Sequence, residues 1–411
     1  MTSEITTLFD QSNFARYERS NYDAFLKASN FSFPLKAIHI SGTNGKGTTA
    51  TALANIYIKA GYKVGLFTSP ALVNYEEMIS INNQLITREQ LDLLAKPYLE
   101  KFKQYNLSTF EMQSFLAFTY FKNNTVDLAI VEVGMGGTID ATNIFTPILS
   151  IITNISLEHT AVLGQNEIGI AKQKSGIIKK DVPLLLGNYF TKEAKEYLLS
   201  YARENNSQVY ELGEIENIIK KGQSLKFSFE NEQYEIATPA KFMATNFALA
   251  VKAVKILAKQ FKVTSSAIKE AGLALKLRGR YEKQRFQKRV IVDGAHNKAA
   301  IKVLIAEINK EIPTPSDIKV VFASFKDKDA DSELKELKTL SKDITLTTFN
   351  HGRARVNEDY EHLPFLYEKN FMKLIKRKYD ELDRDGLLLI TGSLAFSGLV
   401  SKMLEEVNLD E

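Results

Sequence analysis

The sequence predicts an α/β fold in which parallel strands alternate with helices. Short apolar runs alternate along most of the chain with longer amphipathic stretches, which is the pattern of repeated βαβ units. The predicted strands of the first part are each followed by a cluster of Gly, Ser or Asn, as the turns of such units require. At 411 residues the chain is long enough for two or three domains, each with its own core.

In the first part of the chain, apolar runs predict five strands and amphipathic stretches predict two clear helices. The strands are Ala37–Ser41, Lys63–Thr68, Asp127–Val133, Ile148–Ile155 and Pro183–Gly187, and the helices are Thr49–Ala60 and Thr109–Lys122. In the second helix four phenylalanines recur at helical spacing and predict a buried face, because burial of one side demands that spacing. They are Phe110, Phe115, Phe118 and Phe121.

The pattern changes twice in the second half of the chain. Between Tyr210 and Thr238 the apolar runs become shorter and more polar, which predicts an antiparallel edge or subdomain. The segment 276–289 carries seven basic side chains and one acidic one, and we interpret it as the connection between two domains.

After this connection the alternation resumes, and we therefore expect a first domain over residues 1–284 and a smaller α/β domain over residues 285–411. The charged stretch Lys326–Lys338 within it is interpreted as solvated surface. The strands predicted in the second domain are Val290–Asp293, Ile318–Ser324, Ile344–Phe349 and Leu387–Thr391.

Composition excludes several classes of protein. A formal charge of +4 over this length is too small to predict a nucleic-acid or membrane partner. The chain has no cysteine, which rules out disulfides, thiolate catalysis and Cys-ligated metals and fits a reducing compartment. The first residues are polar and acidic where a signal peptide would be basic and then apolar, and no apolar run approaches the ~18–20 residues of a membrane span. We expect a cytoplasmic protein that acts as a monomer.

The strongest functional signal is a strand, AIHIS, that runs into a glycine-rich turn opening a helix. The turn consists of Gly42, Thr43, Asn44, Gly45, Lys46, Gly47 and Thr48. Its glycines let backbone N–H groups approach phosphate oxygens, and the helix N-terminus adds positive charge. Lys46 can reach the terminal phosphates, and the hydroxyl of Thr48 can ligate Mg²⁺. The spacing differs from the usual G-x-x-x-x-G-K-[ST], so a plain glycine-rich turn stays as the alternative to a nucleoside triphosphate site.

Three polar residues lie where predicted strands end. Glu132 lies at the C-terminal end of the apolar run DLAIVEV, His159 follows the next strand, and Asp293 ends a strand of the second domain and precedes Gly294. Ligands bind at the carboxyl ends of strands in α/β sheets, so Glu132 is placed to hold Mg²⁺ on the nucleotide and Asp293 to bind a ligand. The alternatives are a solvated carboxylate for Glu132 and a structural histidine for His159.

The turn GTNGKGT resembles the phosphate loop of the Mur ligase superfamily, and most of the chain is similar to the folylpolyglutamate synthase/dihydrofolate synthase family. Further stretches support the resemblance in the expected order, from about residue 37 to residue 400. They are LFTSPAL, TFEMQSFLAF, VEVGMGGTIDATN, SLEHTAVLG, AKQKSGIIK, VDGAHN, FKDKD and ITGS. The resemblance implies a P-loop ATPase domain of Mur ligase type followed by a smaller Rossmann-like C-terminal domain.

The resemblance also implies the reaction. Members of the family join L-glutamate to a folate by an ATP-dependent amide ligation that passes through an acyl phosphate, which is tetrahydrofolate synthase activity. Some members also use dihydropteroate, which is dihydrofolate synthase activity, and the sequence leaves that second acceptor open. Two alternatives remain: another amide ligase of the superfamily with a different carboxylate acceptor, and a nucleotide-binding paralogue without synthase activity.

Roles for individual residues follow from the resemblance rather than from spacing. It implies one or two Mg²⁺ ions, a catalytic set of Lys46, His159 and Lys174, and a carbamylated Lys174 that helps to hold Mg²⁺. The implied metal ligands are Thr48, Ser69, Glu132, His159 and Lys174, with Thr68 beside them. The residues implied around ATP, besides the loop, are Asn246, Arg280, Asp293 and His296.

The chain departs from the family pattern at several positions. Ala71 stands where His is usual, Met78 where Arg is usual, and Thr138 where Arg is usual, while Ser175 replaces a common Ala after Lys174. These changes leave the residues for ATP and Mg²⁺ intact. Several fall where the pterin substrate or its loop is implied, so they bear on which folate is accepted.

Overall fold

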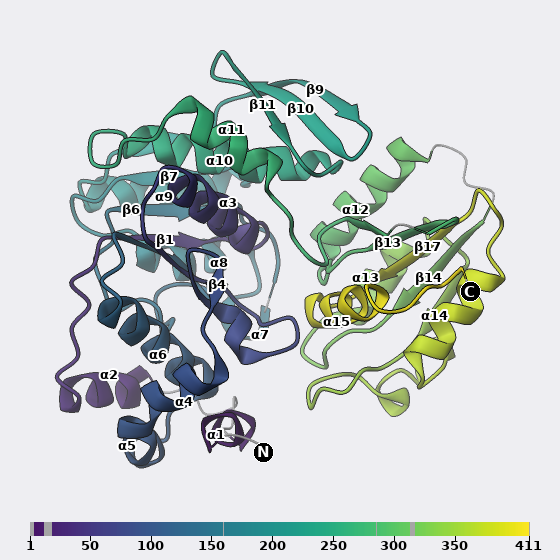
Figure 1. Cartoon of the computed structure of the whole chain (residues 1–411), viewed down its shortest axis with the longest axis horizontal. Helices are drawn as coiled ribbons and strands as arrows, with labels where there is room; N and C mark the ends of the chain where they lie inside the picture. Colours follow the sequence, from purple (N-terminus) through teal and green to yellow (C-terminus); the bar gives the residue numbers. More distant parts are fainter. Residues whose placement is uncertain (1–3, 12–18, 159, 285, 313–316, 411) are drawn as a thin grey trace. The chain divides into compact units, whose positions relative to one another are not determined.

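The structure is a computed structural model that describes residues 4–11, 19–158, 160–284, 286–312 and 317–410. The chain forms two compact units (Figure 1). Unit 1 comprises Met1–Lys220, Lys226–Ala237 and Met243–Leu275, and unit 2 comprises Lys221–Leu225, Thr238–Phe242 and Lys276–Glu411. In the described part of the chain, we find no helix with both the length and the apolar character to cross a membrane.

Unit 1 is built on an eight-stranded sheet with the order β4-β3-β2-β5-β1-β6-β7-β8. From β2 to β8 the neighbouring strands are parallel, whereas β3 and β4 add an antiparallel edge. All five strands predicted in this part are confirmed. The strands are β1 (Ala37–Ser41), β2 (Val64–Phe67), β3 (Ile79–Ile81), β4 (Gln84–Leu85), β5 (Leu128–Glu132), β6 (Leu149–Ile152), β7 (Leu184–Leu186) and β8 (Val209–Glu211).

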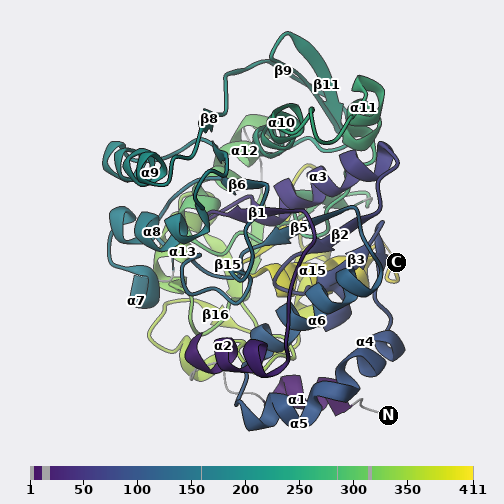
Figure 2. The same cartoon turned by 90° about the vertical axis from the view of Figure 1, so that its left-hand side faces the viewer.

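Helices cover both faces of this sheet, and in Figure 2 α3 lies on one side of the central strands and α6 on the other. A separate three-stranded sheet, in the order β11-β10-β9, fills the segment where a subdomain was predicted. The helices are α1 (Glu4–Gln11), α2 (Arg19–Ala28), α3 (Lys46–Lys59), α4 (Arg88–Ala95), α5 (Leu99–Gln104), α6 (Thr109–Asn123), α7 (Thr160–Leu163), α8 (Glu167–Lys174), α9 (Lys192–Glu204), α10 (Lys241–Ile256) and α11 (Ser265–Leu273), and the small sheet has β9 (Ile215–Lys221), β10 (Ser224–Phe229) and β11 (Glu232–Ile236).

The phenylalanine stripe of α6 forms part of the core of unit 1. Phe115, Phe118 and Phe121 are buried, and Phe110, near the start of the helix, is half-buried. The helix begins at a capping box in which Ser108 and Glu111 each accept the other's backbone N–H. Phe118 packs against Phe67 of β2, whereas Phe115 packs against Phe25 of α2 and Phe102 of α5, so the helix is buried between the sheet and these outer helices.

Unit 2 contains a six-stranded sheet with the order β12-β13-β17-β14-β15-β16, parallel except for the β12–β13 pair. Side chains of α14 and α15 share a core with β13, β14 and β17. The four predicted strands are confirmed, as is the α/β class of both units. The elements are β12 (Glu282–Gln284), β13 (Arg289–Val292), α12 (Lys298–Glu311), β14 (Ile318–Phe322), α13 (Ala330–Leu337), β15 (Asp343–Leu346), β16 (Leu366–Tyr367), α14 (Phe371–Asp380), β17 (Leu387–Thr391) and α15 (Leu394–Leu404).

Two details differ from the expectations for this part of the chain. The basic segment 276–289, interpreted as a connection, contains the short edge strand β12. The stretch Lys326–Lys338, interpreted as solvated surface, forms α13 and buries Glu333, Leu334 and Leu337. The buried face of α13 is hard to recognise in the sequence, because charged residues surround these three positions. A helix of eight residues also has too few turns for the helical spacing of apolar residues to repeat.

Candidate active site

The phosphate loop joins β1 to α3 at the carboxyl end of the unit 1 sheet, and two of its glycines are required by geometry. Gly45 has φ 84° and precedes the first residue of α3, while Gly42 has φ 145°. A Cβ atom on Gly42 would lie 1.9 Å from Thr153 Oγ1, and a Cβ atom on Gly45 would lie 2.3 Å from Asn246 Oδ1. Any side chain at either position would meet both a neighbour and an unfavourable backbone conformation.

A second loop, directly after β6, holds the phosphate loop in place. Asn154 Oδ1 accepts the N–H of Asn44 at 3.0 Å, and Asn154 Nδ2 donates to the carbonyl of Asn44 at 2.8 Å. Thr153 Oγ1 donates to the same carbonyl at 2.7 Å. The sequence analysis missed both residues, although the polar pair at the end of the buried run ILSII was the available signal.

The side chain of Lys46 folds back over the phosphate loop. Its Nζ donates to the carbonyl oxygens of Gly42 at 2.9 Å and Thr43 at 3.1 Å. The ammonium group is therefore held over the loop, where phosphate oxygens can replace these two carbonyl acceptors. Thr48, in the first turn of the helix, is buried.

Glu132, Ser69 and the first turn of α3 come together. Glu132 is buried at the end of β5, and its Oε2 accepts the N–H of Ser69 at 3.0 Å. A Cβ atom on Gly47 would lie 3.1 Å from the same Oε2. The carboxylate thus lies directly against the phosphate loop, which places an oxygen ligand beside the position of a bound nucleotide.

Lys174 joins the same cluster from the end of α8. Its side chain is 1% exposed, and Nζ donates to the Gly42 carbonyl at 2.8 Å and to Glu158 Oε1 at 2.8 Å. Burial lowers the pKa of Lys174; the carboxylate of Glu158 acts in the opposite direction, and Lys46 lowers it further. Glu158 was missed by the sequence analysis. His159, predicted as a catalytic residue and metal ligand, lies outside the described residues.

The turn after Glu132 is fixed by a buried carboxylate. Asp140 accepts the N–H of Met135 at 2.7 Å and the N–H of Thr142 at 3.0 Å. Thr142 Oγ1 also donates to Asp140 and lies 2.8 Å from His39 Nε2, within the strand that leads into the phosphate loop. Burial raises the pKa of Asp140. This network ties β1 to the glycine-rich turn that follows Glu132.

Three predicted ATP residues, Arg280, Asp293 and His296, lie in unit 2. Asp293 follows β13 and is buried; its Oδ2 accepts the N–H of Tyr281 at 2.7 Å and its Oδ1 the N–H of Ala295 at 2.8 Å. Burial raises the pKa of Asp293, and the nearby Arg280 guanidinium opposes that shift. His296 is half-buried, with Nδ1 2.9 Å from the Gly294 carbonyl oxygen. Asn246, the fourth, lies in unit 1 beside Gly45.

The sequence analysis did not identify Ser393, a candidate ligand-binding residue of unit 2 at the start of α15. Ser393 precedes the first residue of this helix and is 2% exposed, and among the described residues its hydroxyl has no hydrogen-bond partner. Helix N-termini bind anions because their first N–H groups are unpaired. The motif ITGS, in which a strand runs into a glycine and a serine, was the available signal.

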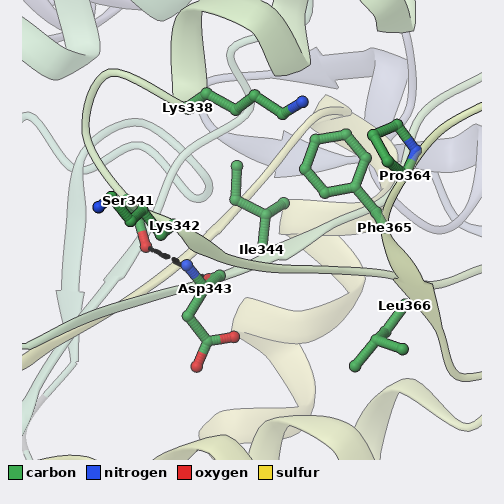
Figure 3. Close-up of a pocket in the computed structure, with 8 residues that line it drawn as sticks. All are labelled: Lys338, Ser341, Lys342, Asp343, Ile344, Pro364, Phe365 and Leu366. Carbon is green, nitrogen blue, oxygen red and sulfur yellow. Dashed lines mark hydrogen bonds between the residues drawn. The ribbon is translucent and has the colours of Figure 1, made fainter.

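A cavity of about 420 Å³ lies elsewhere in unit 2, at the amino end of β15 (Figure 3). Lys338, Lys342, Asp343 and Phe365 contribute to its lining, and Lys338 Nζ lies 4.7 Å from the Phe365 ring centroid. None of the predicted site residues lines it. Ligands of parallel α/β sheets bind at the carboxyl ends of strands, which is the opposite end of this sheet.

The fold and the site define the class of protein. The profile of the Mur ligase middle domain matches residues 40–254, which contain the phosphate loop, Glu132, Lys174 and Asn246. The chain is thus a P-loop ATPase of Mur ligase type with a second α/β unit. Comparison with individual proteins narrows this class to one family.

The chain belongs to the folylpolyglutamate synthase/dihydrofolate synthase family. It is 31% identical over 392 residues to the dihydrofolate synthase/folylpolyglutamate synthase of Bacillus subtilis, covering 90% of this chain and 91% of that one. It is 31% identical over 309 residues to the folylpolyglutamate synthase of Lacticaseibacillus casei, covering 71% of this chain and 72% of that one.

Solved structures agree with this assignment. The Mycobacterium tuberculosis folylpolyglutamate synthase complexed with ADP matches with a TM-score of 0.86 and 25% identity over 98% of this chain and 97% of that one. A structure described as an FPGS–AMPPCP–folate complex matches with a TM-score of 0.84 and 25% identity over 98% of each chain.

Proposed function

We propose that this chain adds L-glutamate to folates in an ATP-dependent ligation. The γ-phosphoryl group of ATP passes to a folate carboxylate, and the amine of glutamate then attacks the acyl phosphate and expels phosphate. Activation is needed because a carboxylate is a poor electrophile. The observation that carries the proposal is the convergence of Lys46, Glu132 and Lys174 on the phosphate loop of a chain that belongs to this family.

The residues of the loop account for ATP binding. Backbone N–H groups at the start of α3 face the phosphates, Lys46 neutralises their charge, and Asn246 lies against the loop at Gly45. No protein nucleophile is required, because phosphoryl transfer depends on positioning and charge stabilisation. In unit 2, Arg280 and the N-terminus of α15 with Ser393 fit anionic groups of the substrates.

The proposal includes Mg²⁺, and the donor set beside the loop fits it. Glu132 and the hydroxyls of Thr48 and Ser69 offer the hard oxygen ligands that Mg²⁺ prefers, with His159 as the implied ligand of a second ion. In the part of the chain that is described, no three His, Asp or Glu side chains are grouped to hold a metal. Mg²⁺ would therefore depend on phosphate oxygens for much of its coordination. When bound, it would neutralise charge on the transferring phosphoryl group.

Carbamylation of Lys174 is part of the proposal. The side chain is buried beside the loop, and the lowered pKa favours the neutral amine that reacts with carbon dioxide. As an ammonium, however, Lys174 is paired with Glu158, and a carbamate would have to leave that pair. Intact-mass measurement of the native protein in bicarbonate, with Lys174→Arg as the control, is expected to reveal a mass increase of one CO₂ in the wild type alone.

Phosphate release from ATP in the presence of L-glutamate tests the proposed activity. Three reactions are compared, with tetrahydrofolate, with dihydropteroate and with no acceptor. Release only with tetrahydrofolate identifies a chain-extending enzyme, and release with both acceptors identifies a bifunctional one. Release with neither folate would move the assignment to another carboxylate acceptor or to a paralogue without synthase activity.

Two substitutions link that activity to the site. Glu132→Ala and Lys174→Ala are each expected to abolish synthesis while the circular dichroism spectrum is retained. Glu270→Ala, an exposed carboxylate on α11, is the matched control and is expected to retain activity. Full activity of either site variant would contradict the assignment.

The proposal also places the enzyme in the cytoplasm as a monomer. The absence of cysteine fits a reducing compartment, and the phosphate loop, Glu132 and Lys174 all belong to one chain. Light scattering with and without ATP measures the oligomeric state, and activity that rises with dimer formation would contradict the monomer.

A further inference from the structure

The turn that carries Arg280 is tightly constrained within unit 2. Gly279 has φ 63°, its N–H donates to Glu282 Oε2 at 2.8 Å, and its carbonyl accepts the N–H of Gly294 at 2.7 Å. Directly after the turn, β12 pairs antiparallel with β13, and Glu282 lies opposite Val292. The backbone on both sides of Arg280 is therefore fixed against the end of β13.

The side chain and backbone of Tyr281 hold this turn against the rest of unit 2. Its side chain is 1% exposed, its hydroxyl donates to Glu311 Oε2 at 3.1 Å, and its ring meets Phe242 edge-on at 6.5 Å. Glu311 is also paired with Lys283. The N–H of Tyr281 donates to Asp293 Oδ2 at 2.7 Å, so one residue is held by its ring, its hydroxyl and its backbone.

The backbone of Tyr281 is strained. Its φ is 48°, in the left-handed region that a tyrosine rarely adopts and that glycine enters without cost. A strained residue persists only where its surroundings enforce it, and such residues gather at functional sites. Here the enforcing contacts are those of Asp293 and Glu311, and they hold the backbone directly after Arg280.

Arg280 has its donors available for a ligand. Among the residues that the structure describes, its guanidinium has no hydrogen-bond partner, although it lies near enough to Asp293 to act on that carboxyl electrostatically. Asp293 is occupied by two backbone N–H groups, so it orients the turn rather than neutralising the guanidinium through a direct hydrogen bond.

We propose that Tyr281 is a positioning residue for nucleotide binding: its left-handed backbone, anchored on Glu311 and Asp293, fixes the turn from which Arg280 contacts the nucleotide. The inference rests on the proposed function, in which Arg280 contacts ATP. It adds a residue outside the predicted site and assigns Asp293 the role of holding the turn. The anchor at Glu311 lies on α12, so the orientation of Arg280 depends on a helix that carries none of the predicted ligand contacts.

ADP affinity, measured by calorimetry, tests this inference without requiring turnover. Arg280→Ala and Tyr281→Gly are each expected to weaken ADP binding roughly ten-fold, the loss of one well-placed charged contact. Because Tyr281 acts through Arg280, the double variant is expected to bind ADP no more weakly than Arg280→Ala alone. Glycine at position 281 tolerates the observed φ, so a loss of affinity reports the missing anchor and not a strained backbone.

Each outcome is decisive. Unchanged affinity in Arg280→Ala or Tyr281→Gly, or losses that add in the double variant, would overturn the inference. Failure of the wild type to bind ADP would instead overturn the proposed nucleotide site.

Two further variants separate positioning from general stability. Tyr281→Phe keeps the ring and removes the hydroxyl that donates to Glu311. It replaces the glycine variant if that variant does not fold, and a smaller loss of ADP affinity is expected. Tyr379→Phe removes another hydroxyl–carboxylate bond of unit 2, to Asp410, and is expected to leave ADP affinity unchanged. In steady-state assays, Tyr281→Phe is expected to raise KM for ATP with little change in KM for glutamate, and equal rises in both would count against the inference.

Discussion

At the scale of single residues, Lys46 shows how the site is prepared for a ligand. Its ammonium is bound to two carbonyl oxygens of the loop, so it is in position before phosphate arrives. We expect Lys46→Ala to lower kcat/KM for ATP by about 10²–10³-fold, the usual cost of removing one preorganised donor.

The matched control for Lys46 is Lys59→Ala, at the last turn of the same helix, where the side chain is exposed. Activity near that of the wild type is expected for the control. Equal losses in both variants would indicate an effect on the helix and not on the phosphates.

Sequence patterns singled out polar residues at strand ends more readily than the residues that support them. The loop, Glu132 and Asp293 occur at strand ends, where position alone indicates function. Glu158 could not be identified in this way, because its role depends on meeting Lys174 from a separate segment of the chain. Lys174 itself was assigned only through the family resemblance, since nothing in local spacing distinguishes it from other lysines.

At the scale of elements, the loop after β6 acts as a clamp on the phosphate loop. Asn154 both accepts from and donates to Asn44, which fixes the loop backbone at that residue. We expect Asn154→Ala to raise KM for ATP roughly ten-fold with a smaller effect on kcat, because a mobile loop must be ordered when ATP binds.

The control for this element is Asn124→Ala, which removes an amide bonded to the Tyr120 carbonyl at the end of α6. It is expected to leave KM for ATP unchanged. Steady-state kinetics with varied ATP measures both variants, and an unchanged KM in Asn154→Ala would show that the clamp is dispensable.

Long buried strands were predictable, whereas short edge strands were not. The boundaries of β1 match the prediction residue for residue, since all five of its positions are buried and the glycine-rich turn directly after it marks its end. The edge strands β4, β12 and β16 have only two or three residues each, too few for a period to emerge. Their existence depends on the neighbouring strand that they extend, and that information is tertiary.

At the scale of the whole molecule, the two units have separate cores, and unit 2 carries an uncompensated buried acid. Glu333 on α13 is fully buried, and among the described residues neither carboxyl oxygen has a hydrogen-bond partner. Burial raises its pKa from 4.5 to about 8, with Lys328 opposing the shift and Asp329 adding to it. The burial of Glu333 could not be predicted from the charged stretch Lys326–Lys338, because burial depends on how α13 packs and not on its composition.

The consequence is a pH-dependent cost to the stability of unit 2. Between pH 4.5 and about 8 the folded protein retains a proton on Glu333 that the unfolded chain releases, so stability falls as pH rises through this window and levels off above it. Glu333→Gln cannot ionise, and we expect it to stabilise unit 2 above pH 8 by about 3–5 kcal/mol, at roughly 1.4 kcal/mol per pKa unit. Near pH 4.5 the variant and the wild type should be nearly equally stable.

Denaturant unfolding followed by circular dichroism measures this difference, since the chain has no tryptophan to report by fluorescence. The exposed Glu361→Gln is the matched control and should show the same stability as the wild type at both pH values. Hydrogen exchange assigns the effect to a unit: amides of unit 2 are expected to slow in Glu333→Gln above pH 8 while those of unit 1 do not, because the two cores are distinct. A stabilisation of equal size at both pH values would mean that improved packing, and not the buried charge, distinguishes the variant.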